Sequence, residues 1–108
     1  MAQPLPLTGV VVTRDEGDRI ARCLRPMLAL CKEVIVLDSG STDDTVAIAR
    51  SLGAQVEHQE WLGYASQKNI AISRASQPWV LLLDADEWLE APAQQTLRTL
   101  FESGAVEA

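Results

Sequence analysis

Two carboxylates at the end of an apolar run are the feature of this sequence best suited to chemistry. Residues 80–83 predict a buried strand, and Asp84 and Asp86 follow it directly. The carboxyl end of a strand is where open α/β sheets usually form a ligand crevice. Residues two apart in an extended stretch point the same way, so both carboxylates can face one divalent cation, which prefers such oxygens. A solvated acidic turn would explain the same residues, so the interpretation depends on the rest of the chain.

Two further acidic segments follow predicted strands. Residues 13–16 (TRDE) come after the first strand and residues 38–45 (DSGSTDDT) after the second. Both would lie at the same sheet edge as Asp84, where Asp38 could accept a hydrogen bond from a base N–H or a ribose hydroxyl. Each segment also suits an ordinary turn into a helix. Three acidic loops at one edge repel each other, so their convergence favours a cation or a donor-rich ligand.

The remaining polar motifs are less specific. Residues 67–69 (QKN) fall near the start of a predicted helix, where they could meet phosphate or base or form an ordinary polar face. The acidic segments do not match an EF-hand loop, and neither a dinucleotide-binding Gly-x-Gly-x-x-Gly nor a Walker motif is present. A single histidine, His58, is read as structural.

Strands and helices are predicted to alternate with short connections. Such alternation gives right-handed crossovers and an α/β fold with a mostly parallel open sheet, covered by helices on both faces. Pro26 should kink or break the first helix, and Asp18 could cap it. Cys23 and Cys31 are expected on that helix about 12 Å apart, too far for a disulfide, as buried reduced thiols. The expected strands are 7–13, 33–37, 55–58 and 80–83, and the expected helices are 18–31, 43–52, 64–75 and about 92–103.

Composition narrows the classes of function. The 108 residues are 47% hydrophobic and 22% charged, which suits one folded domain or part of one. The net charge of −6 and the scattered basic residues argue against nucleic acid as a partner. No apolar run reaches the roughly 18 residues of a membrane span, and the first residues lack the basic start of a signal peptide.

Four motifs in this order resemble those of family 2 glycosyltransferases, which have the GT-A fold. They are VVTRDE (11–16), VLDSGSTDDT (36–45), QKNIA (67–71) and LDADE (83–87). The stretch WLGYASQKN (61–69) is most similar to a bacterial subgroup involved in lipopolysaccharide core biosynthesis. The resemblance covers almost the whole chain, and it implies a GT-A-type, Rossmann-like sheet with about four strands and four helices.

The resemblance also implies an activity. This is the inverting transfer of a sugar from a nucleotide-diphosphate donor, a UDP-sugar above all, to a saccharide or lipid-linked glycan acceptor. Thr13 and Glu16 would then line the nucleoside pocket, and Asp38 would contact the base with Lys68 nearby. Asp84 would face the ribose or diphosphate. Asp86 would hold Mg²⁺ or Mn²⁺, which assists departure of the diphosphate.

The family supplies its catalytic base from sequence beyond this motif. The chain ends 22 residues after Asp86, so the base is expected beyond residue 108, although Glu87 and Glu90 are available carboxylates. Residues 1–108 are therefore interpreted as the donor-binding part of a truncated GT-A domain. We expect weak nucleotide binding, no turnover and self-association, including a homodimer, because a strand edge would be left uncovered.

Two other interpretations remain open at this point. One is a receiver-like phosphoacceptor module, in which Asp15 and Glu16 would be the acidic metal pair and Asp38 the acceptor. The other is a non-catalytic nucleotide-binding domain. For a glycosyltransferase the full protein is expected in the cytoplasm, with peripheral association at the inner face of the bacterial membrane as a further expectation.

Overall fold

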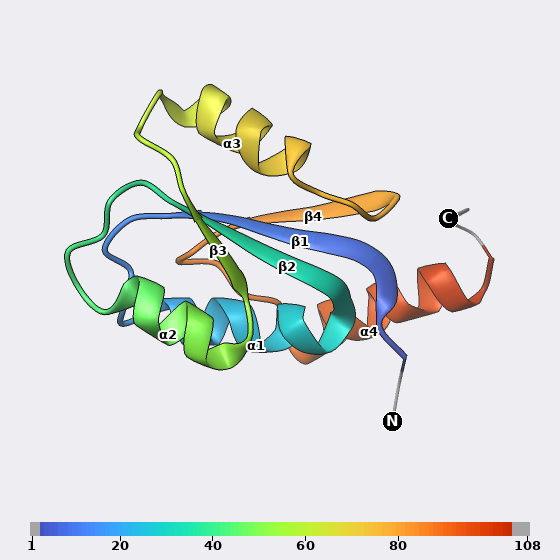
Figure 1. Cartoon of the computed structure of the whole chain (residues 1–108). Helices are drawn as coiled ribbons and strands as arrows, with labels where there is room; N and C mark the ends of the chain where they lie inside the picture. Colours follow the sequence, from blue (N-terminus) through green and yellow to red (C-terminus); the bar gives the residue numbers. More distant parts are fainter. Residues whose placement is uncertain (1–2, 105–108) are drawn as a thin grey trace.

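One parallel sheet with strand order β3-β2-β1-β4 organises the protein. The computed structural model describes residues 3–104. The predicted α/β architecture of GT-A type, with a parallel sheet and four helices, is confirmed (Figure 1). The strands are β1 (Leu5–Thr13), β2 (Cys31–Asp38), β3 (Gln55–His58) and β4 (Trp79–Asp84).

Helices cover both faces of the sheet. Figure 1 shows α3 (Tyr64–Ser73) above the strands, whereas α1 (Ile20–Leu30), α2 (Thr45–Leu52) and α4 (Ala91–Glu102) lie below. Strand residues alternate between these layers, as the pleat requires. Val11 and Val36 join the cluster on the α1 side, and Val10 and Ile35 join the cluster with Ala71 of α3.

Close packing of α1 on the sheet depends on Gly9. A Cβ at this position would come within 2.6 Å of Met27 Cε and 3.4 Å of Cys31 Sγ. Any side chain here would therefore force the buried Met27 to move. The glycine is needed for this close approach of helix and strand.

Three expectations about the first helix are corrected. The helix continues through Pro26 to Leu30, so the predicted break does not occur, while a kink at Pro26 stays a prediction. Its N-cap residue is Arg19, with no capping hydrogen bond from a side chain, so Asp18 does not cap it. Cys31 is the first residue of β2 rather than part of the helix, although it and Cys23 are free and buried as expected.

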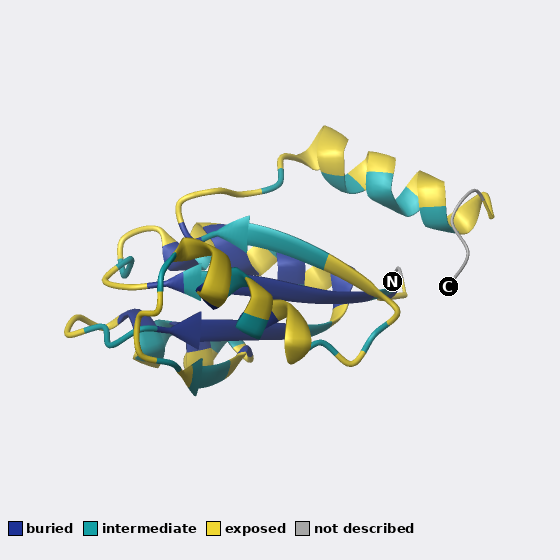
Figure 2. Cartoon of the chain, turned by 90° about the horizontal axis from the view of Figure 1, so that it is seen from above, coloured by how far each residue is buried: buried dark blue, intermediate teal, exposed yellow. Residues whose placement is uncertain are grey.

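The predicted burial of β4 is also corrected. β4 is an edge strand in the described sheet, and Trp79 and Val80 at its start are exposed (Figure 2). A strand at an edge lacks the neighbour that would cover it, which an apolar run cannot reveal. On α3 the buried residues are Gln67 and Ala71, and Ala65 is exposed.

A polar network closes the amino edge of the sheet. The buried Thr8 hydroxyl donates to Glu33 Oε2 at 2.7 Å and accepts the backbone N–H of Gln77 at 3.1 Å. Glu33 Oε2 also accepts the N–H and hydroxyl of Ser76. The Thr8 hydrogen bond is the main reason that the pKa of Glu33 lies below its ordinary value. This network fixes the segment that leads from α3 into β4.

None of the helices among residues 3–104 combines the length and the apolar character that crossing a membrane requires.

Candidate functional site

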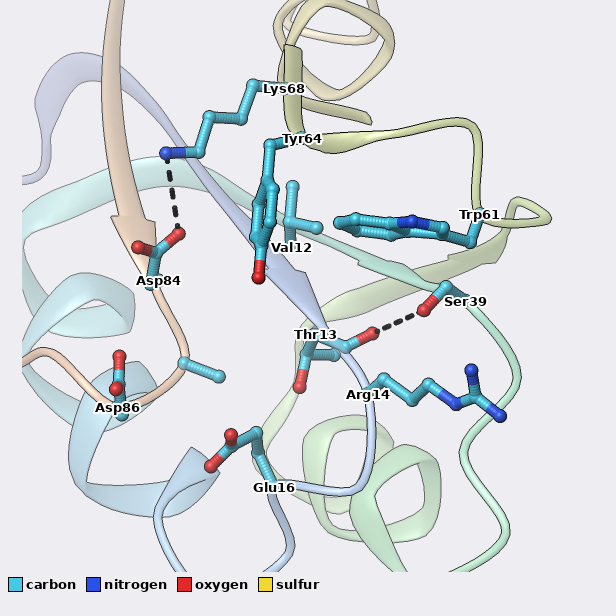
Figure 3. A pocket seen from close by; sticks show the side chains of 11 residues that line it. Val12, Thr13, Arg14, Glu16, Ser39, Trp61, Tyr64, Lys68, Asp84 and Asp86 are labelled. Carbon is cyan, nitrogen blue, oxygen red and sulfur yellow. Dashed lines mark hydrogen bonds and ion pairs between the residues drawn. The ribbon is translucent and has the colours of Figure 1, made fainter. Parts of the chain in front are cut away.

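A cavity of about 380 Å³ opens at the carboxyl edge of the sheet. It lies where β1 and β4 end and where the loop before α3 passes over them (Figure 3). Five predicted site residues line it, namely Thr13, Glu16, Lys68, Asp84 and Asp86. The rest of its lining is Val12, Arg14, Ser39, Trp61, Tyr64 and Ala85.

The loops after β1 and β2 are held together by carboxylates that accept backbone N–H groups. Asp15, at φ 51°, accepts from Thr42 at 2.7 Å. Asp43 accepts from Gly17 at 3.0 Å and also bonds both the N–H and the hydroxyl of Thr45, which lowers the pKa of Asp43. The predicted convergence of acidic loops is present, and N–H donors within the chain relieve part of the repulsion.

Asp38 belongs to this loop-holding group. Only 4% of it is exposed, and it does not line the cavity. Its carboxylate accepts the N–H groups of Gly40 and Ser41 at 3.1 and 2.8 Å and the Ser41 hydroxyl at 2.5 Å. The structure thus gives Asp38 a role in shaping the turn, while its contact with a base stays a prediction.

Two buried oxygens at the cavity have no hydrogen-bond partner among residues 3–104. They are Thr13 Oγ1 and Glu16 Oε2. Glu16 Oε2 lies 2.9 Å from Arg19 Nε as an ion pair, in a geometry that does not make a hydrogen bond. Buried polar atoms normally have partners, so these two oxygens are the clearest sign that the cavity receives a polar ligand.

The Asp84 side chain faces α3 across the cavity. Its Oδ1 lies 3.7 Å from Lys68 Nζ, and both side chains are substantially exposed (Figure 3). An exposed ion pair of this length contributes little stability. Lys68 is therefore available to an anionic ligand at small energetic cost.

Asp84 and Asp86 are not held as two residues of an extended strand. The strand ends at Asp84, and the Glu87 N–H closes a turn by donating to the Asp84 carbonyl at 2.9 Å. Both carboxylates nevertheless reach the same cavity. Beneath the turn, the Cys23 thiol donates to the Asp84 carbonyl at 3.6 Å. Burial, reinforced by the charges of Glu87, Asp86 and Asp84, raises the pKa of Cys23 to about 12 and keeps this donor protonated.

Two aromatic side chains form one wall of the cavity. Trp61 and Tyr64 make an edge-to-face pair with ring centroids 4.8 Å apart, and both are exposed. The buried Gln67 fixes their loop by accepting the Leu62 N–H at 3.2 Å and donating to the Gln59 carbonyl at 3.4 Å. Exposed rings at a cavity mouth can stack on a base or a sugar.

The cavity contains suitable donors for Mg²⁺ or Mn²⁺. No group of three or more His, Cys, Asp or Glu side chains forms a metal cage within residues 3–104. Such a cage is not required, since Mg²⁺ is usually held by one or two carboxylates together with substrate phosphates. Asp84 and Asp86 provide carboxylate oxygens in the cavity, so the chemistry of the donor set fits the ion.

Six lining residues were not predicted from the sequence as site residues: Val12, Arg14, Ser39, Trp61, Tyr64 and Ala85. Arg14 and Ser39 adjoin predicted residues at the ends of β1 and β2, and this adjacency was an available signal. Trp61 and Tyr64 fall in a loop whose path depends on Gln67. Their occurrence in the family-like stretch 61–69 was the only pointer in the sequence.

The model of the family described as "Glycosyl transferase family 2" matches residues 8–106. The chain belongs to this family. An uncharacterized glycosyltransferase of Rickettsia conorii is 44% identical over 97 residues, covering 90% of this chain and 34% of the relative. The lipopolysaccharide core biosynthesis glycosyltransferase LpsC of Rhizobium meliloti is 34% identical over 105 residues, covering 93% of this chain and 38% of that protein.

This membership decides against the receiver-like alternative. Asp15, its candidate metal ligand, instead accepts the Thr42 N–H between the two loops. The chain spans about a third of the length of the curated relatives it matches.

Solved structures share the fold. Glucosyl-3-phosphoglycerate synthase from Mycobacterium tuberculosis, in complex with Mn²⁺, UDP and glucosyl-3-phosphoglycerate, has a TM-score of 0.70 and 26% identity, covering 87% of this chain and 37% of that one. The S. aureus TarS structure has a TM-score of 0.74 at 22% identity, covering 90% and 32%. The TarS likeness concerns the fold alone.

Proposed function

We propose that residues 1–108 form the donor-binding part of a metal-dependent, inverting glycosyltransferase. The observation that carries the proposal is the single cavity that gathers Thr13, Glu16, Lys68, Asp84 and Asp86 at the carboxyl edge of a parallel sheet. Family membership supports it, as does the related synthase crystallised with UDP and Mn²⁺.

The chemistry of each side chain suggests its role at a nucleotide diphosphate. Thr13 Oγ1 and Glu16 Oε2, which make no hydrogen bond among residues 3–104, would accept hydrogen bonds from the nucleoside, and the Lys68 ammonium would meet an anionic oxygen. Asp84 would face the ribose or diphosphate, and Asp86 would hold Mg²⁺ or Mn²⁺. A bound ion supplies charge neutralisation at the diphosphate leaving group.

Metal-dependent binding of UDP tests this proposal. UDP would be titrated with and without Mn²⁺ while tryptophan fluorescence is followed, because Trp61 lines the cavity and Trp88 adjoins the acidic turn. We expect Mn²⁺ to strengthen binding at least about tenfold, since it offsets repulsion between the carboxylates and the diphosphate. Asp86→Asn should abolish this enhancement and leave the melting temperature unchanged.

Asp18→Asn is the matched control, because Asp18 is exposed and does not line the cavity. It should behave like the parent chain. If the parent chain does not bind UDP, the proposed function is wrong. If Asp86→Asn retains the full Mn²⁺ enhancement, Asp86 is not the metal ligand.

The acceptor site and the base are proposed to lie beyond residue 108. The relative LpsC favours a lipopolysaccharide-core acceptor, and hence a cytoplasmic protein working at the inner face of the membrane. The exposed β4 edge favours self-association of this chain. A transfer assay over a panel of donors should show no turnover, and light scattering should detect dimers. A monomer with turnover would contradict this part of the proposal.

A further inference from the structure

The backbone of Asp84 is held at both of its polar groups by one neighbour, Glu87. The Asp84 N–H donates to Glu87 Oε1 at 2.8 Å, and the Glu87 N–H donates to the Asp84 carbonyl at 2.9 Å. As in one half of a capping box, a Glu side chain reaches back to the backbone N–H three residues earlier, and a backbone hydrogen bond closes the same turn. From the α1 side, the Cys23 thiol donates a third hydrogen bond to this backbone, at the Asp84 carbonyl.

These hydrogen bonds lie at the end of an edge strand, where only one neighbouring strand of the described sheet pairs with the backbone. β4 is an edge strand of the described sheet, and Asp84 is its last residue. Only one residue, the buried Ala85, separates the two carboxylates that reach the cavity. Their relative placement is therefore set by the backbone of the turn, which the Glu87 side chain closes.

Glu87 is placed differently from a residue that acts on the ligand. It does not line the main cavity, whereas Asp84 and Asp86 do. Its Oε1 atom accepts a backbone N–H, a task for which a neutral amide oxygen also serves. Glu90, the other carboxylate considered for the base, accepts the Trp88 indole N–H at 2.9 Å.

We propose that Glu87 is a positioning residue that holds the Asp84–Asp86 turn in the geometry needed to bind a cation and a diphosphate together. This inference rests on the proposed function. Mg²⁺-type coordination tolerates little departure from octahedral geometry, and a shift of about 1 Å in a supporting turn is enough to weaken such a site. The role requires an acceptor oxygen at residue 87, not a negative charge.

The contact itself can be tested without nucleotide. Amide hydrogen exchange at Asp84 would be measured by ¹⁵N NMR in the parent chain, Glu87→Ala and Glu87→Gln. Glu87→Ala removes the acceptor, so we expect exchange at Asp84 to accelerate about tenfold or more. Glu87→Gln keeps an acceptor oxygen and should remain within about threefold of the parent chain. Equal exchange in all three would overturn the contact.

The role in binding is tested with UDP and Mn²⁺ on the same three proteins. In Glu87→Ala, the factor by which Mn²⁺ strengthens UDP binding should fall about tenfold, and Glu87→Gln should retain most of this enhancement. The control is Glu90→Ala, which removes a carboxylate three residues away and should behave like the parent chain. Melting temperatures and circular dichroism confirm that each variant is folded.

The results distinguish the inference from the proposed function. If Glu87→Gln loses the enhancement as fully as Glu87→Ala, the charge of Glu87 is what matters and the positioning role is wrong. If both variants keep the enhancement, the role is also wrong. If the parent chain fails to bind UDP, the proposed function fails, and the Asp84 exchange rates still decide whether Glu87 holds the turn.

Discussion

Two threonines of the same strand, both buried, differ in what their hydroxyls contact. Thr8, near the amino end of β1, both donates and accepts a hydrogen bond. Thr13, at the carboxyl end, has no partner for its hydroxyl among residues 3–104. A similar contrast holds for carboxylates. Glu33 Oε2 accepts three hydrogen bonds, whereas Glu16 Oε2 accepts none among residues 3–104 and meets only Arg19, as an ion pair.

The contrast separates two uses of buried polar groups. At the amino edge they join α3, β1 and β2 to the start of β4, so their hydrogen bonds stabilise the fold. At the cavity they are desolvated without a hydrogen-bond partner among residues 3–104, which costs stability unless a ligand supplies one. Burial and residue type are alike at the two ends, so only the presence of partners distinguishes a structural group from one that faces a ligand.

The largest effect is expected from Thr8→Val. The substitution keeps the shape but leaves the Gln77 N–H without its acceptor and Glu33 without its shortest hydrogen bond. We expect the free energy of unfolding in urea to fall by about 1–3 kcal/mol. UDP affinity, measured under conditions where the variant is folded, should stay unchanged. An unchanged unfolding free energy would remove the contrast between the two ends.

The reverse outcome is expected from Thr13→Val. Its buried hydroxyl makes no hydrogen bond in the described chain, so its removal should not lower the unfolding free energy and should raise it by about 1 kcal/mol. UDP affinity should fall about threefold to tenfold, because a ligand would lose one hydrogen bond. Isothermal titration beside urea unfolding measures both quantities. A stability loss as large as that of Thr8→Val would show that Thr13 has a structural partner.

The smallest effect concerns pH. The folded pKa of Glu33 lies below its ordinary value of 4.5, mainly because of the Thr8 hydrogen bond. The ionised Glu33 side chain therefore contributes its full stabilisation of the fold above about pH 4.5, and this contribution is lost as the pH falls through the folded pKa. The parent chain should exceed Glu33→Gln in unfolding free energy at pH 7, and the difference should shrink towards pH 3. A constant difference across this range would mean that the carboxylate charge contributes nothing.

Strand positions were predictable because each strand is a compact apolar or β-branched run. The expected strand 55–58 coincides with β3, and the predicted parallel pairing is present. Exposure of β4 was not predictable, since a run such as 80–83 has the same composition in the middle of a sheet as at its edge. The burial of Gln67 on α3 was not predictable, because its side chain is polar and its amide is satisfied by the backbone of its own loop.

The site shows a similar division. Thr13, Asp84 and Asp86 were located because strand ends converge on one edge whatever the loops do. Asp38 also lies at that edge, but its carboxylate turns into the loop before α2. Sequence places a residue at an edge, whereas the direction of its side chain depends on local N–H donors. Trp61 lies in the cavity wall because the hydrogen bonds of Gln67 fix the path of its loop. Such hydrogen bonds produce no periodic pattern in the sequence.

Two buried thiols lie at opposite ends of this architecture. Cys23 lies beneath the Asp84 turn, and Cys31 starts β2 at the amino edge, with burial raising its pKa to about 11. Thiols of this kind react with alkylating reagents only when the surrounding structure opens. The unmodified protein therefore has one cysteine to label at each end of the sheet. Alkylation of each cysteine can be followed separately by the mass of the peptide that contains it. Reaction rates at the two sites would compare how often the ligand-facing end and the structural end open under native conditions.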